Sequence, residues 1–283
     1  MILIADGGST KVDWVAVDKY KTEFFKTRTK GLNPAIVDSN CIKQRILENC
    51  NLEEAKNKVH KIFFYGAGCG TIKAKHKLIK TFEEIFTNAI IVVEEDMLAA
   101  VYAASYEKPA IVCILGTGSN SCYFDGKGIK SNAISLGWAI MDEASGNYFG
   151  KKLIRDYFYE IMPVKIRNKF KVVYNLDSDY VKEQLYKGLN PNAYLANHAA
   201  FMYEFKNEEY IISLMEEGVE EFFRYRVLPY GKGKETPVYF IGSIAYYFSD
   251  IISRVSQKHN LYFAGAIQRP IDKMLNYHID NLI

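Results

Sequence analysis

Apolar and polar positions alternate in short runs along the first 30 residues. The run Ile2 to Ala5 and the run Val12 to Val17 are rich in β-branched residues, which is typical of short buried or half-buried strands. A third run covers Thr22 to Thr29, after the polar turn Asp18-Lys19-Tyr20-Lys21. The pattern therefore predicts three strands joined by turns, an antiparallel meander.

Beyond the loop Lys30 to Pro34 the pattern alternates between helical and strand spacing. The segments that we expect are a helix around Ile42 to Leu47, a strand at Lys61 to Tyr65, a helix at about Ile72 to Phe86, a strand at Ile90 to Val93 and a helix at Asp96 to Tyr106. Because strands and helices alternate, the first domain is expected to be a mixed α/β layer structure.

The second half begins with a repeat of the opening pattern. The stretch 111-IVCILGTGSNSCYFDGKG-128 is again a strand, a turn of glycine and hydroxyl residues, and a second strand, which indicates an internal duplication. The linker is expected at Glu107-Lys108-Pro109, since proline removes a donor and restricts the residue before it. Later segments are expected as helices at Ala144 to Ile161, Asp179 to Lys187 and Glu208 to Tyr225, a strand at Val238 to Ile241, a helix from Ser243 onward and a helix at Ile271 to His278. The domains are thus 1–108 and 109–268, and the C-terminal helix within 269–283 is a candidate to pack back on the first.

Composition and charge exclude several classes of function. The 283 residues carry a formal net charge of +3, with Lys and Arg interleaved with Asp and Glu, so no basic surface for nucleic acid is indicated. No apolar run is long enough for a signal peptide core or a membrane span, and we expect a cytoplasmic protein. The five cysteines form no CxxC pair and indicate neither a disulfide framework nor a zinc site, so a bound metal is expected to prefer oxygen ligands.

The turn Asp6-Gly7-Gly8-Ser9-Thr10 has two interpretations. In one, glycine supplies the backbone freedom of a hairpin turn and the hydroxyls bond locally. In the other, amides free of side chains and the hydroxyls of Ser9 and Thr10 bind phosphate. The second turn, with Thr117 and Ser119, favours phosphate, because two such units could hold a polyphosphate. Asp6 would then complement the Mg²⁺ that accompanies it.

Other phosphate motifs fit less well. No GxxxxGK[ST] sequence occurs, which excludes a P-loop. The run 65-YGAGCGT-71 lies between a predicted strand and a predicted helix, but its third glycine is misplaced for a dinucleotide-binding turn. Gly66, Gly68 and Gly70 are better explained by close approach of the backbone to a ligand or by tight packing.

Four segments together resemble a known superfamily. The loops Asp6 to Lys11 and Gly116 to Asn120, with 136-LGWAIMDEASGNYFG-150 and 241-IGSIAYYF-248, resemble the sugar kinase, Hsp70 and actin superfamily. Within it they are most similar to the N-acetylglucosamine kinase and BadF/BadG/BcrA/BcrD-type ATPase family. The resemblance covers nearly the whole chain and implies an α/β fold of two ribonuclease-H-like (actin-like ATPase) domains, with ATP and substrate in an interdomain cleft.

The resemblance also implies roles for particular residues. It implies that Asp6 serves Mg²⁺ and that Asp96, at the start of its helix, takes the proton of the sugar hydroxyl; from sequence alone Asp96 is equally the N-cap of a helix Met97 to Tyr106. The residues implied to bind ATP are Gly7, Gly8, Ser9, Thr10, Lys11, Gly116, Thr117, Gly118, Ser119 and Asn120 at the phosphates, and Gly242 and Ser243 at the adenosine, where a helix N-cap is the alternative. The residues implied to lie near the sugar are Asn33, Trp138, Asp142 and Glu143, for which a turn residue, a core aromatic and a solvated helix start are the alternatives.

The chain departs from the family pattern at one of these segments. The usual G-D-E-G-S is here Met141-Asp142-Glu143-Ala144-Ser145. Since a side chain disfavours left-handed backbone and close approach of a ligand, we expect neither Met141 nor Ala144 to provide them.

The expected function is ATP-dependent phosphorylation of an amino sugar, N-acetylglucosamine at its 6-hydroxyl. The expected partner is a small-molecule sugar, and neither nucleic acid nor membrane is expected. The sequence leaves open whether the chain forms a homodimer. One alternative is an ATPase activator of a 2-hydroxyacyl-CoA dehydratase system, although Cys41, Cys50 and Cys69 lack the compact spacing of an iron–sulfur site. The second alternative is a protein that senses nucleotide or sugar without turnover.

Overall fold

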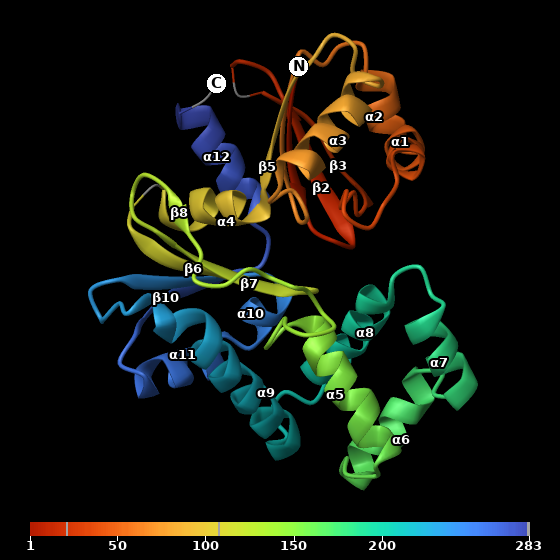
Figure 1. Cartoon of the computed structure of the whole chain (residues 1–283), viewed down its shortest axis with the longest axis vertical. Coiled ribbons are helices and arrows are strands. Elements are labelled where there is room, and N and C mark those ends of the chain that lie inside the picture. The colour runs from red at the N-terminus through yellow and green to blue at the C-terminus, as the bar shows by residue number, and fades with distance from the viewer. Residues whose placement is uncertain (21, 107, 282–283) are drawn as a thin grey trace. The chain divides into compact units, whose positions relative to one another are not determined.

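The computed structural model describes residues 1–20, 22–106 and 108–281, and the expected turn residue Lys21 and linker residue Glu107 lie outside the described residues. The chain divides into two compact units. The first comprises Met1–Glu107 with Arg269–Ile283, and the second comprises Lys108–Gln268 (Figure 1). Each unit is built on one five-stranded mixed sheet.

The sheet of the first unit has the order β3-β2-β1-β4-β5. Strands β1 and β2 and strands β2 and β3 pair antiparallel, which confirms the predicted meander. Strands β1, β4 and β5 run parallel, so their carboxyl ends meet at one edge of the sheet. The strands are β1 (Ile2–Gly7), β2 (Lys11–Val17), β3 (Glu23–Lys30), β4 (Lys61–Gly66) and β5 (Ile90–Glu95).

Helices cover both faces of this sheet, because alternate residues of each strand point to opposite sides. Leu3 and Ala5 of β1 belong to a core with the first three helices, whereas Ile2 and Ile4 belong to a core with α4 and α12. The tail is therefore part of the first unit. The helices are α1 (Ser39–Leu47), α2 (Cys50–Ala55), α3 (Ile72–Glu83), α4 (Asp96–Ser105) and α12 (Ile271–Asn281).

The second sheet repeats the topology of the first. Its order is β10-β9-β6-β7-β8, with β6, β7 and β8 antiparallel in turn and β6, β9 and β10 parallel. Strand for strand, β6 corresponds to β1 and β9 to β4, as the repeated glycine turn predicted. The strands are β6 (Ala110–Leu115), β7 (Ser119–Phe124), β8 (Ile129–Lys130), β9 (Pro237–Ile241) and β10 (Tyr262–Ile267).

A helical insertion separates β8 from β9 in the second unit. Its elements are α5 (Gly146–Phe158), α6 (Val164–Val173), α7 (Ser178–Tyr186), α8 (Pro191–Ala199), the 3₁₀ turn η1 (Ala200–Tyr203), α9 (Glu209–Phe222), the π-helix η2 (Phe223–Val227) and the 3₁₀ turn η3 (Leu228–Tyr230), and α10 (Ser243–Tyr247) and α11 (Ser249–Lys258) follow β9. The sequence pattern did not predict α2, α6, α8 or β10. It also began α5 too early, since Ser145 is the N-cap and its hydroxyl accepts from the Tyr148 amide.

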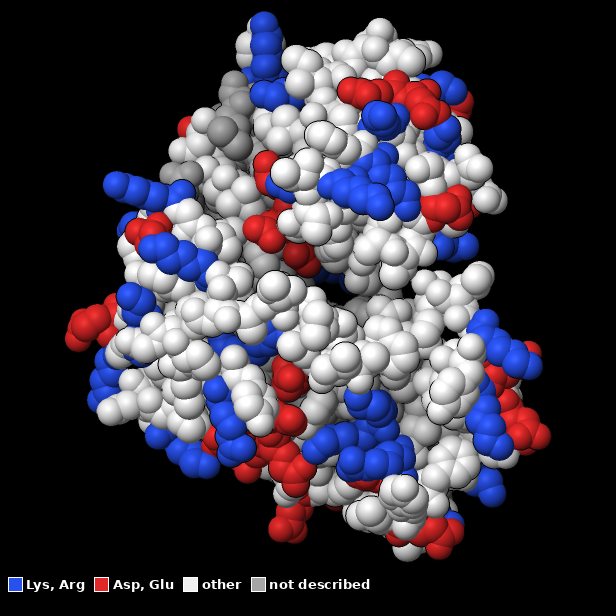
Figure 2. All heavy atoms as spheres, in the orientation of Figure 1, with Lys and Arg blue, Asp and Glu red and all other residues white. Residues whose placement is uncertain are grey.

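Surface charge and helix length agree with the composition. On the face that Figure 2 shows, basic and acidic side chains are interspersed. Within the described ranges, no helix is both long and apolar enough to cross a membrane.

Candidate active site

Strand alternation places Asp6 on the same face of the first sheet as α4. Ile2, Ile4 and Asp6 are alternate residues of β1, and the first two pack in the core with α4 and α12. In the register of β1 and β2, Asp6 lies opposite Asp13, so both carboxyl groups face the same side. An acid here ends a buried apolar row at the carboxyl edge of the sheet.

Asp96 reaches the same edge from the neighbouring strands. In the parallel register Gly7 lies beside Gly66 and Gly66 beside Glu95, so β1, β4 and β5 end side by side. Asp96 follows directly as the first residue of α4. Ligands of α/β proteins bind at the carboxyl ends of parallel strands, which makes this edge the candidate site of the first unit.

The electrostatics of this edge favour protonated carboxyl groups. Burial, and then the negative charges of Asp13 and Asp96, raise the pKa of Asp6 to about 7. Burial, and then the charge of Glu95, raises the pKa of Asp96 to about 6. Arg28 forms an ion pair with Asp13 at 2.6 Å. Asp6 and Asp96 are thus a mutually repelling pair of acids that would favour a cation, and perturbed acids of this kind cluster at functional sites.

The interpretation of Asp96 as an N-cap is wrong. The N-cap of α4 is Glu95, whose backbone is extended and whose side chain makes no capping hydrogen bond. Asp96 is already helical, and its carboxylate is stabilised by the amides of the first turn, including that of Met97. The acid is therefore not required to define where the helix begins.

The β1–β2 turn is open on one side and braced on the other. A Cβ at Gly8 would contact only the carbonyl of Lys11, at 3.5 Å, so packing does not require glycine there. Behind the turn, Gly31 donates its amide to the carbonyl of Thr10 at 2.9 Å, and a Cβ at Gly31 would lie 2.1 Å from the carbonyl oxygen of Ser9. Gly31 thus holds the turn, and the position of a Cβ at Gly8 is open.

Asn33 lies beside the glycine-rich run that follows β4. Its side-chain oxygen accepts from the amide of Ala35 at 2.9 Å. A Cβ at Gly68, whose φ is +80°, would overlap that side chain. At Gly66 a Cβ would collide with the ring of Phe64. Tight packing thus explains Gly66 and Gly68, and it brings Asn33 to the carboxyl end of β4.

The β6–β7 turn of the second unit is braced by the start of α5. The amide of Gly146 donates to the carbonyl of Gly116 at 2.8 Å, and the amide of Asn147 donates to that of Thr117 at 3.0 Å. Gly242, with φ +115°, packs so closely that a Cβ would lie 2.4 Å from the carbonyl oxygen of Leu115. The first amides of α5 therefore fix the turn, and Gly242, the N-cap of α10 before Ser243, adjoins it.

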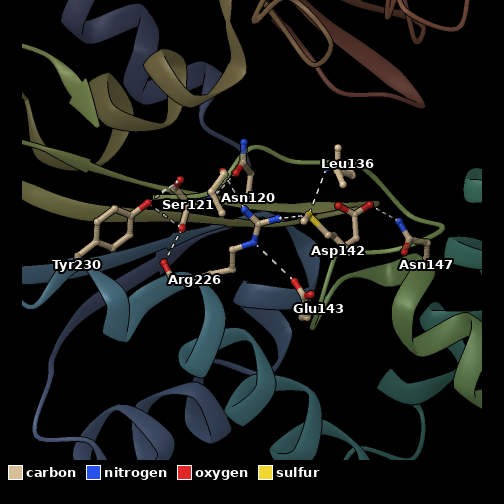
Figure 3. Close-up of polar contacts among 10 residues, drawn as sticks. Asn120, Ser121, Leu136, Asp142, Glu143, Asn147, Arg226 and Tyr230 are labelled. Carbon is tan, nitrogen blue, oxygen red and sulfur yellow. Dashed lines mark hydrogen bonds and ion pairs between the residues drawn. The ribbon is translucent and has the colours of Figure 1, made fainter. Parts of the chain in front are cut away.

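Asp142 connects this turn with the predicted sugar segment (Figure 3). Its Oδ2 accepts from Asn147 Nδ2 at 2.9 Å, and a Cβ at Gly118 would lie 2.7 Å from the same oxygen. Burial raises the pKa of Asp142, whereas hydrogen bonds from Asn147 and from the Ser119 amide oppose that shift. Residues that the sequence predicts at the phosphates and residues that it predicts at the sugar are therefore adjacent in the second unit.

The expectation about Ala144 is wrong. Its φ is +57° and that of Asp142 is +72°, so the segment is left-handed at both residues without a glycine. Left-handed backbone costs an alanine about 1–2 kcal/mol. Ala144 is buried in the core that contains Phe149, and the surrounding packing therefore enforces the conformation. Met141 does not adopt a positive φ, as expected.

Three buried polar atoms near Asp142 lack a hydrogen-bond partner within the described part of the chain: Ser119 Oγ, Asn147 Oδ1 and Glu143 Oε2. Buried polar groups are normally satisfied, so unpaired ones indicate a ligand or water. Sequence reasoning did not select Asn147. The available signal was an amide residue in the first turn of a predicted helix, a few residues after Asp142 and Glu143. Trp138 is half-buried and packs against the core of the second unit.

The acids fit a metal site whose ligands come partly from the protein and partly from a bound phosphate and water. In the part of the chain that the structure describes, no three His, Cys, Asp or Glu side chains form a cluster that could hold a metal. Mg²⁺ in phosphoryl-transfer enzymes is held by one or two carboxylates together with phosphates and water. Asp6 fits this role, and the open backbone at Gly8 fits an approaching phosphate.

Comparison with known proteins identifies the fold. Neither the protein-family models nor the curated proteins gave a match to the chain. Among solved structures, the chain is similar to a Porphyromonas gingivalis protein provisionally assigned as an N-acetylglucosamine kinase, with 32% identity, 100% of both chains covered and a TM-score of 0.90.

Two more distant structures share the fold. One is a Chromobacterium violaceum protein with the same provisional assignment, at 14% identity, 98% coverage of each chain and a TM-score of 0.71. The other is the ROK family glucokinase of Streptomyces griseus in complex with glucose and AMPPNP, at 12% identity, 98% and 97% coverage and a TM-score of 0.59. The predicted two-domain actin-like ATPase fold is confirmed, and the chain belongs to the sugar kinases of that fold.

Proposed function

We propose that this chain transfers the γ-phosphoryl group of ATP to an amino sugar, N-acetylglucosamine at its 6-hydroxyl. The observation that carries the proposal is the pair Asp6 and Asp96, two acids with raised pKa values beside an open glycine turn. The provisional assignment of the Porphyromonas gingivalis protein supports the substrate class. The AMPPNP bound to the Streptomyces griseus glucokinase supports the nucleotide.

Two glycine turns, β1–β2 and β6–β7, would bind the phosphates of the nucleotide. In the first, the amide side of Gly8 and the residues to Lys11 would face phosphate, with Asp6 as the carboxylate for Mg²⁺. In the second, the turn Gly116 to Asn120 would do so, with Gly242 and Ser243 at the adenosine. When bound, Mg²⁺ neutralises the charge of the phosphates. Gly116 supports this role, because its nearest neighbour for a Cβ is the carbonyl of Gly118 at 4.0 Å.

Asp96 would act as the general base. Its carboxylate takes the proton of the 6-hydroxyl while the hydroxyl oxygen forms a bond to the γ-phosphorus, and the bond from that phosphorus to the bridging oxygen of ADP breaks. A base with a pKa of about 6 is ionised at neutral pH yet still accepts a proton readily. The first turn of α4 favours the ionised form that must begin each cycle.

Four polar and aromatic side chains would bind the sugar. Asn33 presents an amide beside the end of β4, and Glu143 presents a carboxylate oxygen, Oε2, that accepts no hydrogen bond from the described residues. Trp138 offers an aromatic face and Asp142 a second carboxylate. A sugar has alternating hydroxyl edges and apolar faces, and this set of side chains matches both.

A coupled assay of ADP release over a panel of hexoses and N-acetylated hexosamines tests the proposal. We expect release with N-acetylglucosamine, a 6-phosphate product, and loss of both in Asp96→Asn. Binding of ATP and sugar without ADP release would instead indicate a sensing protein. A brown protein with iron–sulfur absorbance would indicate a dehydratase activator; its cysteines Cys41 and Cys50 lie on α1 and α2, whereas Cys69 is buried.

A further inference from the structure

Arg226 is a buried cation in the π-helix η2. Its side chain is 3% exposed, whereas Arg224 in the same π-helix is exposed. A π-helix is rare and often marks a functional position. A buried guanidinium is costly unless its donors are used, so the contacts of Arg226 show what it is there to hold.

The guanidinium contacts the segment 133–143 at three points (Figure 3). It donates to the carbonyl of Ala133 at 3.3 Å and to the Met141 sulfur at 3.2 Å. It also lies 3.7 Å from Glu143 Oε2, an ion pair too long for a hydrogen bond. The Met141 sulfur also accepts a hydrogen bond from the Leu136 amide at 3.3 Å. The side chain thus joins the beginning and the end of the segment that contains Trp138.

Met141 is one of the two residues that replace a glycine of the family pattern. Its sulfur is the acceptor for both Arg226 and Leu136, so the replacement supplies a contact that glycine could not make. The positive charge of Arg226 also opposes the rise in the pKa of Asp142 that burial causes. Arg226 therefore contacts Glu143 and favours the ionised form of Asp142, the two residues that we call the acidic pair of this segment.

The backbone of Arg226 makes a separate contact with the phosphate side. Its carbonyl accepts from Ser121 Oγ at 2.6 Å, and Ser121 also contacts the hydroxyl of Tyr230 at 3.1 Å. The Ser121 amide donates to the Asn120 side chain at 2.9 Å, at the end of the turn proposed for phosphate. One residue thus contacts the sugar segment through its side chain and the phosphate strand through its backbone.

We propose that Arg226 is a positioning residue for the sugar: its guanidinium, through Met141 and Glu143, holds the segment 133–143 so that Trp138 and the acidic pair face the substrate. This inference rests on the proposed function. Because the contact with Ser121 uses a backbone atom, replacing the side chain should impair the sugar and spare the nucleotide.

Steady-state kinetics of Arg226→Met test whether the side chain affects the sugar and not the nucleotide. We expect the KM for N-acetylglucosamine to rise about tenfold or more, since a misplacement of about 1 Å can cost a hundredfold. The KM for ATP should stay within about threefold. The matched control is Arg224→Met, in the same π-helix but exposed, which should change neither. Ser121→Ala should show the reverse, a larger effect on ATP than on the sugar.

A second variant covers the case in which Arg226→Met fails to fold. Met141→Leu keeps the volume but removes the sulfur acceptor, and such replacements are usually well tolerated. It should raise the sugar KM in the same direction, by less. Equal changes in both KM values, or an unchanged sugar KM in folded Arg226→Met, would overturn the proposal.

Tryptophan fluorescence separates this inference from the proposed function. The chain has two tryptophans, and Trp14 is buried at 1% exposure while Trp138 is half-buried. Acrylamide should therefore quench Trp138 more strongly in Arg226→Met than in the parent, without any ligand. If the parent phosphorylates no sugar but this change is seen, the proposed function fails and the positioning of the segment stands. If quenching is unchanged, the positioning role is wrong.

Discussion

Neutralising Asp6 should make the folded protein more stable while it removes activity. Asn has the shape of Asp without the charge, and the raised pKa of Asp6 shows that the fold resists that charge. Residues kept at the expense of stability are typical of functional sites. Asp6→Asn should therefore lower kcat strongly, because the variant lacks the carboxylate proposed for Mg²⁺, and yet melt at a higher temperature.

The magnitude follows from the difference between the two pKa values of Asp6. The carboxyl titrates near 3.8 when unfolded and at about 7 when folded, and each unit is worth about 1.4 kcal/mol, so the upper limit is about 4 kcal/mol. Since the side chain keeps some solvent contact, we expect about 2 kcal/mol. The contribution of Asp6 to stability is most favourable below about pH 4, where both states are protonated. It is lost as the pH rises through about 7, so the advantage of the Asn variant should grow over that range.

Thermal unfolding of parent and variant in EDTA, at pH 4 and pH 8, measures this difference. We expect similar midpoints at pH 4 and a midpoint about 4–8 °C higher for the variant at pH 8. Asp18→Asn is the control with the opposite sign, because backbone hydrogen bonds, chiefly from Thr22, lower the pKa of Asp18. A variant of Asp6 that is destabilised equally at both pH values would refute the reasoning.

Further predictions concern the base and the turns. Asp96→Asn should lower kcat by roughly a hundredfold with little change in sugar affinity, and full turnover would exclude Asp96 as the base. In the parent, kcat/KM should fall as the pH drops below about 6, because Asp96 then gains its proton, and a flat profile down to pH 5 would contradict this. Gly8→Ala and Gly116→Ala should each raise the KM for ATP about tenfold without changing the melting temperature. Gly128→Ala, which also places its Cβ in open space, is the control and should change neither quantity. If the three variants had the same KM for ATP, the two turns would not be part of the nucleotide site. Gly31→Ala should lower both the melting temperature and ATP affinity, since its Cβ would lie 2.1 Å from a carbonyl of the first turn, and an unchanged protein would show that the brace is dispensable.

The candidate site of the first unit could be predicted further than that of the second, because its residues lie at strand ends. Asp6, near the end of β1, and Asp96, directly after β5, each follow an apolar run, and parallel strands bring such ends together. The elements that the pattern missed depend on tertiary packing. In α8, for example, the carbonyl of Leu195 lies so close to Gly150 of α5 that a Cβ there would be at 1.8 Å. No local periodicity encodes such a contact.

The second unit shows how a distant residue can change the meaning of a local one. Met141 in place of a family glycine suggests, by itself, a lost contact with substrate. In the fold its sulfur binds Arg226, 85 residues away in sequence, and the neighbouring Ala144 keeps a left-handed backbone at its own cost. With both glycines replaced, the segment still has left-handed backbone at Asp142 and Ala144 and is bound to Arg226 through Met141. Since the backbone strain at Ala144 must be offset by surrounding contacts, the segment is held by packing and by Arg226 rather than by glycine, and sugar specificity should be more sensitive to residue 226 than to residue 144.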